Sequence, residues 1–329
     1  MEDRSVPLTS RAGPRESRFG RLALTTLVAT LSLVAVGGLT RGSGSGYGCE
    51  DRWPLCEDGA LGGLLPRAEY HMVVEWTHRW VAAIVGLLAL ALAWSAWRHH
   101  RHDRRIVVPA VAAVGVIGFQ AWIGRMVVAE DLDADLVALH LATAMIVVAL
   151  LTAVLVHALP RWDAPPPGRA WVAWVGAGAL SAYALLILGS MVHNEYVGGW
   201  PLVGDELVPD LESRTVAIHF FHRLAAAGVL VFLAALAVAA RRRRRPRGET
   251  RLLDVALAGI LVNVGLGAAH VFTEVTSSAL VITHLAVASV VWAALVAATL
   301  LARRAEVDTP AGGPDRRAAA VADVPAPSA

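Results

Sequence analysis

The chain has 329 residues, of which 56% are hydrophobic and 17% charged, and its formal net charge is +2. The apolar residues come in blocks of about 20, the length that a helix needs to cross a hydrocarbon core about 30 Å thick. These values exclude an ordinary water-soluble domain and indicate a protein that crosses a membrane several times.

Eight spans are predicted, and in chain order they lie near residues 21–40, 74–97, 106–128, 136–158, 170–192, 216–240, 252–273 and 278–302. Backbone polar groups in lipid need partners within the protein, and long runs of Ala, Val, Leu and Gly suit helices rather than the alternating strands of a membrane barrel. We therefore expect an all-α polytopic membrane protein with eight transmembrane helices.

The charged residues are divided unequally between the two sides of the membrane. Arginines gather before the first predicted span and after the second, fourth and sixth, whereas the opposite loops are acidic or mixed. By the positive-inside rule both termini are cytoplasmic, and we expect the protein in the plasma membrane. The arginine run 241–245 could instead bind nucleic acid. Because it lies beside a span, we interpret it as a topology determinant that contacts membrane lipid, and we expect no nucleic-acid partner.

Four histidines within the predicted spans form two copies of one pattern. His78 and His140 are 62 residues apart, as are His222 and His284, and a shift of 144 residues carries the first pair onto the second. A fixed shift of this kind marks an internal repeat. A second echo supports it, because Trp-Pro-Leu at 53–55 recurs at 200–202.

The repeat predicts two pseudo-symmetric four-helix bundles. The expected organisation is a cytoplasmic N-terminal segment at 1–20, an N-terminal half at 21–159, a proline-rich cytoplasmic linker at 160–169, a C-terminal half at 170–302 and a disordered cytoplasmic tail at 303–329. The tail has no apolar periodicity, which is typical of disordered segments.

All four histidines lie near the start of an even-numbered span, so each pair lies at one depth near the outer leaflet. Imidazole is a common axial ligand of haem iron, and helix bundles supply such ligands from facing helices. A lone intramembrane histidine is as often a packing or proton-relay residue, but a duplicated pattern favours ligands. We expect two bis-histidine haem sites. Zinc or copper is the alternative, although the Cys and carboxylate ligands usual for those metals have no equivalent in both halves.

Glu75 is the single residue that most specifically indicates a function. It precedes His78 by three positions, so both project from one helix face. A carboxylate in an apolar span is costly, which indicates a function, and the alternative is an inert position at the aqueous boundary. Its repeat partner is His219, so only the first half has an acid beside its site. His219 also rivals His222 as a ligand, but the repeat favours His222.

Four further residues are candidates for the site. Arg79 and Arg223 directly follow a histidine and could pair with haem propionates, or serve as interface anchors. Cys49 and Cys56, the only cysteines, lie in the first outer loop and could form a disulfide there, as a structural clip or as a redox-active pair. His270, in the seventh span, is interpreted as a packing residue or a neighbour of the ligands.

These residues resemble those of the haem A synthase family, membrane enzymes that convert haem O to haem A for cytochrome oxidase. The matching pieces are GGLTRGSGSG at 37–46, the cysteines that flank RWPL, EWTHR at 75–79, HL at 140 and 284, and HR at 222. The resemblance covers about residues 21–302. The sequence departs from the family pattern at QAWIGRMVV in the third span, where a Gly-Gly-x-Thr stretch is usual, and in a second outer loop without cysteines.

The resemblance implies that the first half binds the haem O substrate and the second half a haem b cofactor. It also implies that Glu75 is essential for catalysis and that the two cysteines can form a disulfide. The reaction would oxidise one porphyrin methyl group to a formyl group through hydroxylated intermediates, with Glu75 accepting a proton or positioning water. Haem O synthase is a candidate partner, and the electron acceptor is unknown.

The alternative function is a di-haem b-type cytochrome that passes electrons between quinol and another acceptor. Both functions use the same four histidines. They differ at Glu75, because simple electron transfer needs no carboxylate in one half alone.

Overall fold

The structure is a computed structural model that describes residues 14–56, 59–159, 168–192, 196–204, 206–274 and 276–307. The predicted N-terminal segment up to residue 13, most of the linker and most of the tail lie outside the described residues. Within these ranges the helices are α1 (Pro14–Gly42), α2 (Ala60–Gly63), α3 (Tyr70–His100), α4 (Arg104–Ala129), α5 (Ala134–Ala158), α6 (Arg169–Met191), α7 (Arg214–Arg242), α8 (Arg247–Phe272) and α9 (Ser278–Val307).

The prediction of an all-α membrane protein with eight spans is confirmed. Eight helices, all except the four-residue α2, are long and apolar enough to cross a membrane. Most extend a few residues beyond the predicted spans, because a helix can continue past the hydrocarbon core while long basic side chains at its ends reach the interface. α1, for example, begins at Pro14 rather than near residue 21.

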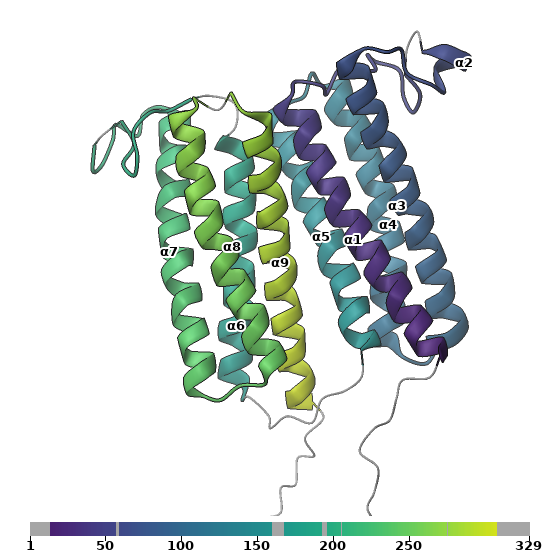
Figure 1. The fold of residues 1–329 in the computed structure, drawn as a ribbon, viewed down its shortest axis with the longest axis vertical. Coiled ribbons are helices and arrows are strands. Elements are labelled where there is room, and N and C mark those ends of the chain that lie inside the picture. The colour runs from purple at the N-terminus through teal and green to yellow at the C-terminus, as the bar shows by residue number, and fades with distance from the viewer. Residues whose placement is uncertain are drawn as a thin grey trace, which may run out of the picture.

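The spanning helices form two groups that stand side by side (Figure 1). In the first group α1 packs on α3 and α5, and α4 packs on both of those helices; in the second, α6 packs on α7 and α9, and α8 packs on both. The packing pattern is thus the same in both groups, and it is consistent with the predicted division into two halves. The domain boundaries themselves stay a prediction.

Small residues let the helices approach closely. Fully buried alanines such as Ala96 and Ala113 in the first group, and Ala240 and Ala298 in the second, lie within the two large apolar clusters. Between helices in lipid, attraction comes from close van der Waals packing rather than from the exclusion of water, so small residues at the contacts favour association.

The two groups meet along α5, with α9 and α6 packed against it, and along α1, which also packs on α9. Two polar contacts cross this boundary. Tyr183 on α6 donates its hydroxyl to the Ala142 carbonyl at 3.0 Å, and Trp292 on α9 donates Nε1–H to the Met145 carbonyl at 2.8 Å. The two aromatic rings lie 5.1 Å apart. The boundary is therefore anchored on the backbone of α5, about half a turn to one and a half turns beyond His140.

Candidate functional site

The structure places the four predicted histidines at matching depths in matching helices. His78 is the ninth residue of α3 and His222 the ninth of α7, whereas His140 is the seventh of α5 and His284 the seventh of α9. At about 1.5 Å of rise per residue, each ring lies roughly 9 to 12 Å along its helix. All four helices begin at the same end of the bundle (Figure 1).

The histidines are brought together in the predicted pairs. His78 and His140 are close enough for charges on their rings to interact, and so are His222 and His284. In the second pair the ring of His270 is a further neighbour, edge-on to His284 with a centroid distance of 5.7 Å. The interpretation of His270 as a packing neighbour of a ligand agrees with this contact.

Each of the four rings has the same nitrogen buried without a partner. Among the described residues, Nδ1 of His78, His140, His222 and His284 is enclosed and makes no hydrogen bond, whereas Nε2 of none of them is enclosed in this way. Buried polar atoms usually have a hydrogen-bond partner. These Nδ1 atoms have none, so packing and not a hydrogen bond holds the rings. Nε2 is left as the nitrogen that can reach a ligand between the helices.

A glycine of a neighbouring helix lies against each ring. A methyl group added at these glycines would approach the Cε1 atom of the ring at 3.2 Å for Gly37 and His78, 3.3 Å for Gly124 and His140, 2.8 Å for Gly189 and His222, and 3.9 Å for Gly267 and His284. Contacts under about 3.4 Å leave no room for a side chain unless the ring moves. Gly37, Gly124 and Gly189 therefore limit how far their imidazoles can retreat into the bundle, whereas Gly267 leaves His284 an ordinary contact distance.

Side-chain amides hold the backbone at two of the histidines. Gln120 on α4 donates Nε2–H to the His140 carbonyl at 3.0 Å, and its Oε1 accepts from the Thr143 hydroxyl at 2.6 Å. In the second half, Asn263 on α8 has the amide orientation that satisfies both of its atoms when it donates to the His284 carbonyl at 3.1 Å and accepts from the Ala288 N–H at 3.2 Å. The same helix turn is thus fixed in both halves.

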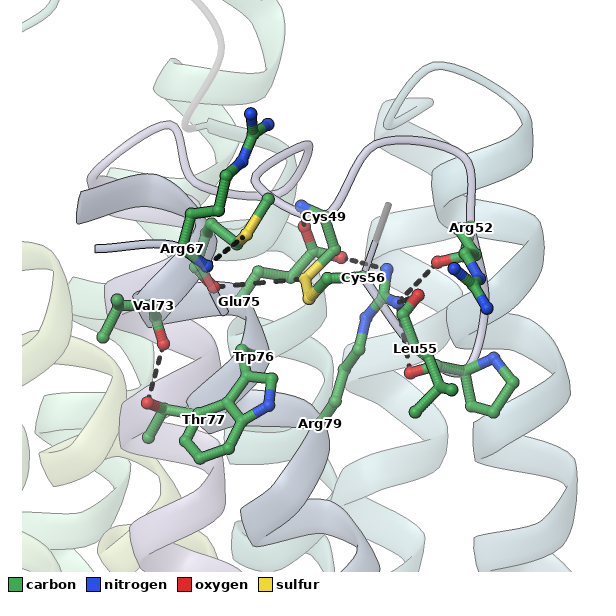
Figure 2. The surroundings of a disulfide bond; sticks show 12 residues. Cys49, Arg52, Leu55, Cys56, Arg67, Val73, Glu75, Trp76, Thr77 and Arg79 are labelled. Atoms are coloured by element: carbon green, nitrogen blue, oxygen red, sulfur yellow. Dashed lines mark hydrogen bonds and ion pairs between the residues drawn. A yellow bond between two sulfur atoms is a disulfide. The ribbon is translucent and has the colours of Figure 1, made fainter. Parts of the chain in front are cut away.

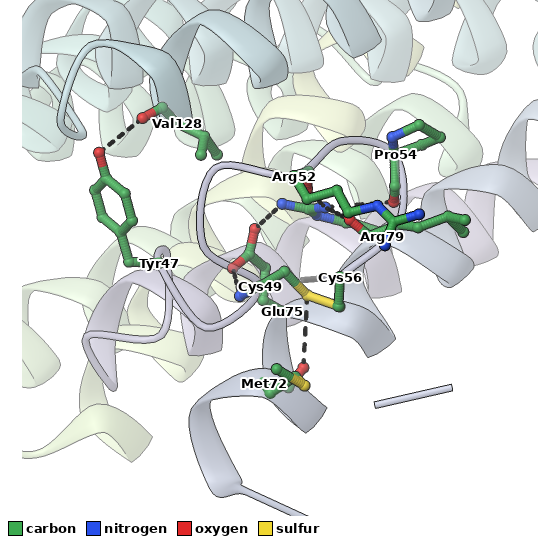
Figure 3. Close-up of polar contacts among 10 residues, drawn as sticks. Tyr47, Cys49, Arg52, Pro54, Cys56, Met72, Glu75, Arg79 and Val128 are labelled. Atoms are coloured by element: carbon green, nitrogen blue, oxygen red, sulfur yellow. Dashed lines mark hydrogen bonds and ion pairs between the residues drawn. A yellow bond between two sulfur atoms is a disulfide. The ribbon is translucent and has the colours of Figure 1, made fainter. Parts of the chain in front are cut away.

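Glu75 is buried, with 3% of its surface exposed. Its Oε2 accepts a hydrogen bond from the Cys49 backbone N–H at 2.7 Å, and its Oε1 forms an ion pair with the Arg79 guanidinium at 2.5 Å (Figure 3). Glu75 is therefore not solvated at the aqueous boundary, and its function stays a prediction. A carboxylate in such a position is retained only when it is paired, and here both oxygens have a partner.

The two predicted arginines bind the loops at the end of the bundle where α3 and α7 begin. Arg79 donates to the carbonyls of Arg52, Pro54 and Leu55 at 2.7, 3.3 and 3.2 Å (Figure 2). Arg223 donates to the carbonyls of Val197, Gly199 and Leu202 at 3.0, 2.6 and 2.6 Å. Both sets of carbonyls belong to the loops that carry the repeated Trp-Pro-Leu sequence.

The repeat therefore reappears in the hydrogen bonds of Arg79 and Arg223. Each arginine directly follows a histidine and holds the loop before its helix against that helix. This contact is in keeping with the predicted role as an anchor at the interface. Pairing with haem propionates stays a prediction, since the terminal nitrogens shown here already donate to protein oxygens.

Cys49 and Cys56 form a disulfide, and both are fully buried. The bond closes the loop above the start of α3, next to Glu75 (Figure 2). Gly48, directly before Cys49, lies so close to the backbone of His71 and Met72 that an added methyl group would collide with both residues. The loop is therefore pressed onto the first turn of α3.

The same loop is also joined to the turn between α4 and α5. The Tyr47 hydroxyl lies within hydrogen-bond distance of the Val128 carbonyl, at 2.9 Å (Figure 3), and of Asp131 Oδ1, at 2.5 Å. The hydrogen bond to the Asp131 carboxylate raises the pKa of Tyr47 to about 12. The loop that covers Glu75 is thus fixed at three points: the disulfide, Arg79 and Tyr47.

The glycines and amides around the histidines are not among the residues predicted from the sequence. A signal for them exists, because a shift of 143 residues carries Gln120 to Asn263 and Gly124 to Gly267. An alignment of the two halves over whole spans, and not at the histidines alone, would reveal these matching residues. Gln120 is also the first residue of the QAWIGRMVV stretch that departs from the family pattern.

The donor set suits haem better than zinc or copper. The part of the chain that the structure describes contains no group of three or more His, Cys, Asp or Glu side chains that could hold a metal ion. Zinc sites take three or four such ligands, whereas haem iron needs two axial ligands and the porphyrin supplies the others. Two pairs of imidazoles, each with Nδ1 enclosed and Nε2 not, meet the second requirement.

Fold and site together define a multi-pass helical membrane protein with two histidine pairs inside its helix bundles, one of them near a buried acid. The sequence profile of the COX15-CtaA family, described as cytochrome oxidase assembly protein, matches residues 20–296. The chain belongs to this family. The predicted resemblance is thereby confirmed.

The chain is similar to several proteins named heme A synthase, three of which follow. The relative from Alkalihalophilus pseudofirmus is 30% identical over 292 residues, which cover 85% of this chain and 95% of that protein. The one from Shouchella clausii is 29% identical over 271 residues, covering 79% and 87%. The one from Halalkalibacterium halodurans is 30% identical over 226 residues, covering 65% and 72%.

Proposed function

We propose that this protein is a haem A synthase, an oxidoreductase that converts haem O to haem A. It oxidises one methyl group of the porphyrin to a formyl group through hydroxylated intermediates. Similarity to heme A synthases along most of the chain supports this function. The observation that carries it is Glu75, a buried and paired carboxylate three residues before a histidine of the first pair and without an acidic counterpart in the second half.

The first half binds the haem O substrate through His78 and His140, and the second half binds a haem b cofactor through His222 and His284. This division follows from the acid, because the half that performs chemistry on a substituent needs a proton acceptor near the ring. When bound, haem b supplies one-electron redox chemistry and so an exit for the electrons taken from the methyl carbon. The acceptor beyond it is not assigned.

Glu75 accepts the proton or positions the water that the oxidation requires. A carboxylate has about four lone-pair positions, of which the N–H groups of Cys49 and Gly48 and the Arg79 guanidinium engage up to three, so one or more lone pairs are left. Arg79 and the disulfide loop fix the direction in which those lone pairs point. A group fixed in this way can take a proton without reorganising, which is the usual source of catalytic advantage for a positioned base.

The glycines and amides position the ligands. Gly37 and Gly124 back the rings of the substrate pair, and Gly189 and Gly267 those of the cofactor pair. Gln120 and Asn263 fix the backbone of the second ligand in each half. Because no hydrogen bond restrains Nδ1, packing alone sets the orientation of each ring.

The protein lies in the plasma membrane with both termini in the cytoplasm and the disulfide loop outside. The end of the bundle with the α7–α8 turn carries the arginine run, as the positive-inside rule requires of the cytoplasmic side. The opposite end carries Cys49 and Cys56, whose bond persists in an oxidising compartment. Haem O synthase, the source of the substrate, is the candidate partner.

The test is the pigment of cells that make haem O but no haem A. Expression of this chain should convert haem O to haem A, measured by chromatography and mass spectrometry of the extracted haems. The matched control is the same chain with His78→Ala and His140→Ala. A strong b-type spectrum without any haem A or hydroxylated haem would instead identify a di-haem cytochrome and reject the proposed function.

A further inference from the structure

The turn between α7 and α8 lies at the end of the bundle opposite the disulfide loop (Figure 1). It carries seven arginines within eleven residues, namely Arg241, Arg242, Arg243, Arg244, Arg245, Arg247 and Arg251. Some of them surround an open hollow of about 420 Å³ that is lined by Arg241, Arg244, Arg245, Arg247, Thr250 and Arg251. Orientation of the chain needs only net positive charge at this end, and it does not need a shaped hollow.

A buried anchor holds the turn in shape. Arg245 and Glu249 form an ion pair at 2.9 Å, and their side chains are only 6% and 2% exposed. Trp171, at the start of α6, donates Nε1–H to the same carboxylate. The guanidinium of Arg243 lies over the Trp171 ring at 5.2 Å. The arginines around the hollow therefore project from a fixed backbone rather than from a loose loop.

Not all of the positive charge is neutralised. Arg241 pairs with Asp254 at 2.7 Å, and Arg245 pairs with Glu249. For Arg244, Arg247 and Arg251 the described residues provide no side-chain hydrogen bond or ion pair, although all three line the hollow. Three guanidinium groups along one hollow can donate to the oxygens of a phosphate group, and the backbone N–H groups at the start of α8 add to the attraction.

Apolar surface continues from the hollow into the membrane. Val238 lies three residues before Arg241 and is 47% exposed, and Val255 lies four residues after Arg251 and is 46% exposed. Seven residues farther from the hollow along each helix, Val231 and Val262 are 70% and 52% exposed on the same helix faces. Acyl chains can lie along these valines while a phosphate lies among the arginines.

We propose that the α7–α8 hollow binds the phosphate of an anionic phospholipid, with its acyl chains along α7 and α8. Phosphate recognition alone would also admit free inorganic phosphate, but the rows of exposed valines favour a lipid. The site is independent of the haem chemistry, so it stands or falls apart from the proposed function.

The test compares two triple variants of the full-length protein. The first variant removes the unpaired positive charge of the hollow through Arg244→Gln, Arg247→Gln and Arg251→Gln. The matched control, Arg98→Gln, Arg101→Gln and Arg104→Gln, removes the same charge around the α3–α4 turn at the same end of the bundle. Each protein is mixed with equal amounts of phosphatidylglycerol and phosphatidylcholine in detergent, and the retained lipid is measured by native mass spectrometry.

Wild type and the control should retain phosphatidylglycerol about ten-fold or more over phosphatidylcholine, and the α7–α8 variant should lose this preference. A second variant set with lysine at the three positions keeps the charge and should keep most of the preference, which separates recognition from misfolding. Equal loss in both glutamine variants, or no preference in wild type, would overturn the proposal. Displacement of the lipid by millimolar inorganic phosphate would assign the hollow to a soluble anion instead.

Discussion

Cys49 and Glu75 are joined by a hydrogen bond in which the cysteine backbone N–H donates to Oε2 at 2.7 Å. The same cysteine is bonded to Cys56, and the loop between them supplies carbonyls to Arg79, which pairs with the other oxygen of Glu75. The disulfide thus holds both partners of the candidate catalytic acid. The disulfide that closes the loop therefore also supports the position of Glu75.

Loss of the disulfide should therefore lower haem A production without abolishing it. The double variant Cys49→Ser, Cys56→Ser keeps the backbone N–H that Glu75 needs but frees the loop that presents it. We expect a smaller loss than for Glu75→Gln, measured as haem A per protein in cells. In the isolated wild type, alkylation without reductant followed by mass spectrometry should label neither cysteine. Two labelled thiols would contradict the disulfide.

Histidine substitutions should separate the two haem sites. His222→Ala or His284→Ala should remove the tightly bound b-type signal, because each leaves the second half with one axial ligand. His78→Ala or His140→Ala should leave that signal largely in place and impair conversion of haem O. Reduced-minus-oxidised spectra of the purified variants measure the first effect and haem extraction the second. An undiminished b-type signal in both second-half variants would reject this division.

Two glycine substitutions in one haem site should have unequal effects. A methyl group at Gly189 would lie 2.8 Å from His222 Cε1, whereas one at Gly267 would lie 3.9 Å from His284 Cε1, which is ordinary contact. Overpacking costs about 1–3 kcal/mol, so Gly189→Ala should weaken haem b binding by about ten-fold or more and Gly267→Ala should barely change it. Haem titration of the two purified variants measures this. Equal affinities would show that the glycines do not position the rings.

The contact between Tyr47 and Asp131 should have a distinct pH dependence. A pKa raised to about 12 means that the protonated hydroxyl stabilises the folded loops below the ordinary tyrosine pKa near 10, and that this contribution is lost as pH rises through about 12. Subtracting the ultraviolet titration of Tyr47→Phe from that of wild type should isolate this transition. Asp131→Asn should move it down toward 10. A transition already near 10 in wild type would argue against the hydrogen bond.

Hydropathy and the repeat were enough to predict the eight spans and the four histidines. Both signals are local or periodic: a span is an unbroken apolar block, and a duplicated ligand appears at a fixed shift. The short helix α2 at Ala60–Gly63 was not predicted, because three of its four residues have positive backbone φ angles and the sequence has no helical periodicity there.

The surroundings of Glu75 could not be predicted in the same way. Its bonds to Cys49 and Arg79 depend on how the outer loop folds back onto α3, across 26 residues in the case of Cys49. The spacing of Glu75 and Arg79, four residues apart on one helix, did allow an ion pair. That the arginine would also collect three loop carbonyls is a matter of tertiary structure, which spacing along one helix does not encode.

The central claim is that Glu75 serves the oxidation rather than the binding of haem. Glu75→Gln keeps the size of the side chain and an oxygen that can accept from Cys49, but it removes the basic carboxylate. A positioned base contributes about 10²–10⁴-fold to a rate, so haem A production should fall by about a hundred-fold or more. Glu69→Gln is the matched control, since it removes an acid whose side chain is 62% exposed just before α3.

The decisive measurement is made on cells that supply haem O and carry wild type, Glu75→Gln or Glu69→Gln. Haems are extracted and separated by chromatography, and the bound-haem spectrum of each purified protein is recorded beside them. The proposed role predicts that Glu75→Gln binds haem normally while haem O stays unoxidised, and that Glu69→Gln behaves as wild type. Normal haem A production by Glu75→Gln would contradict it, as would loss of bound haem together with activity.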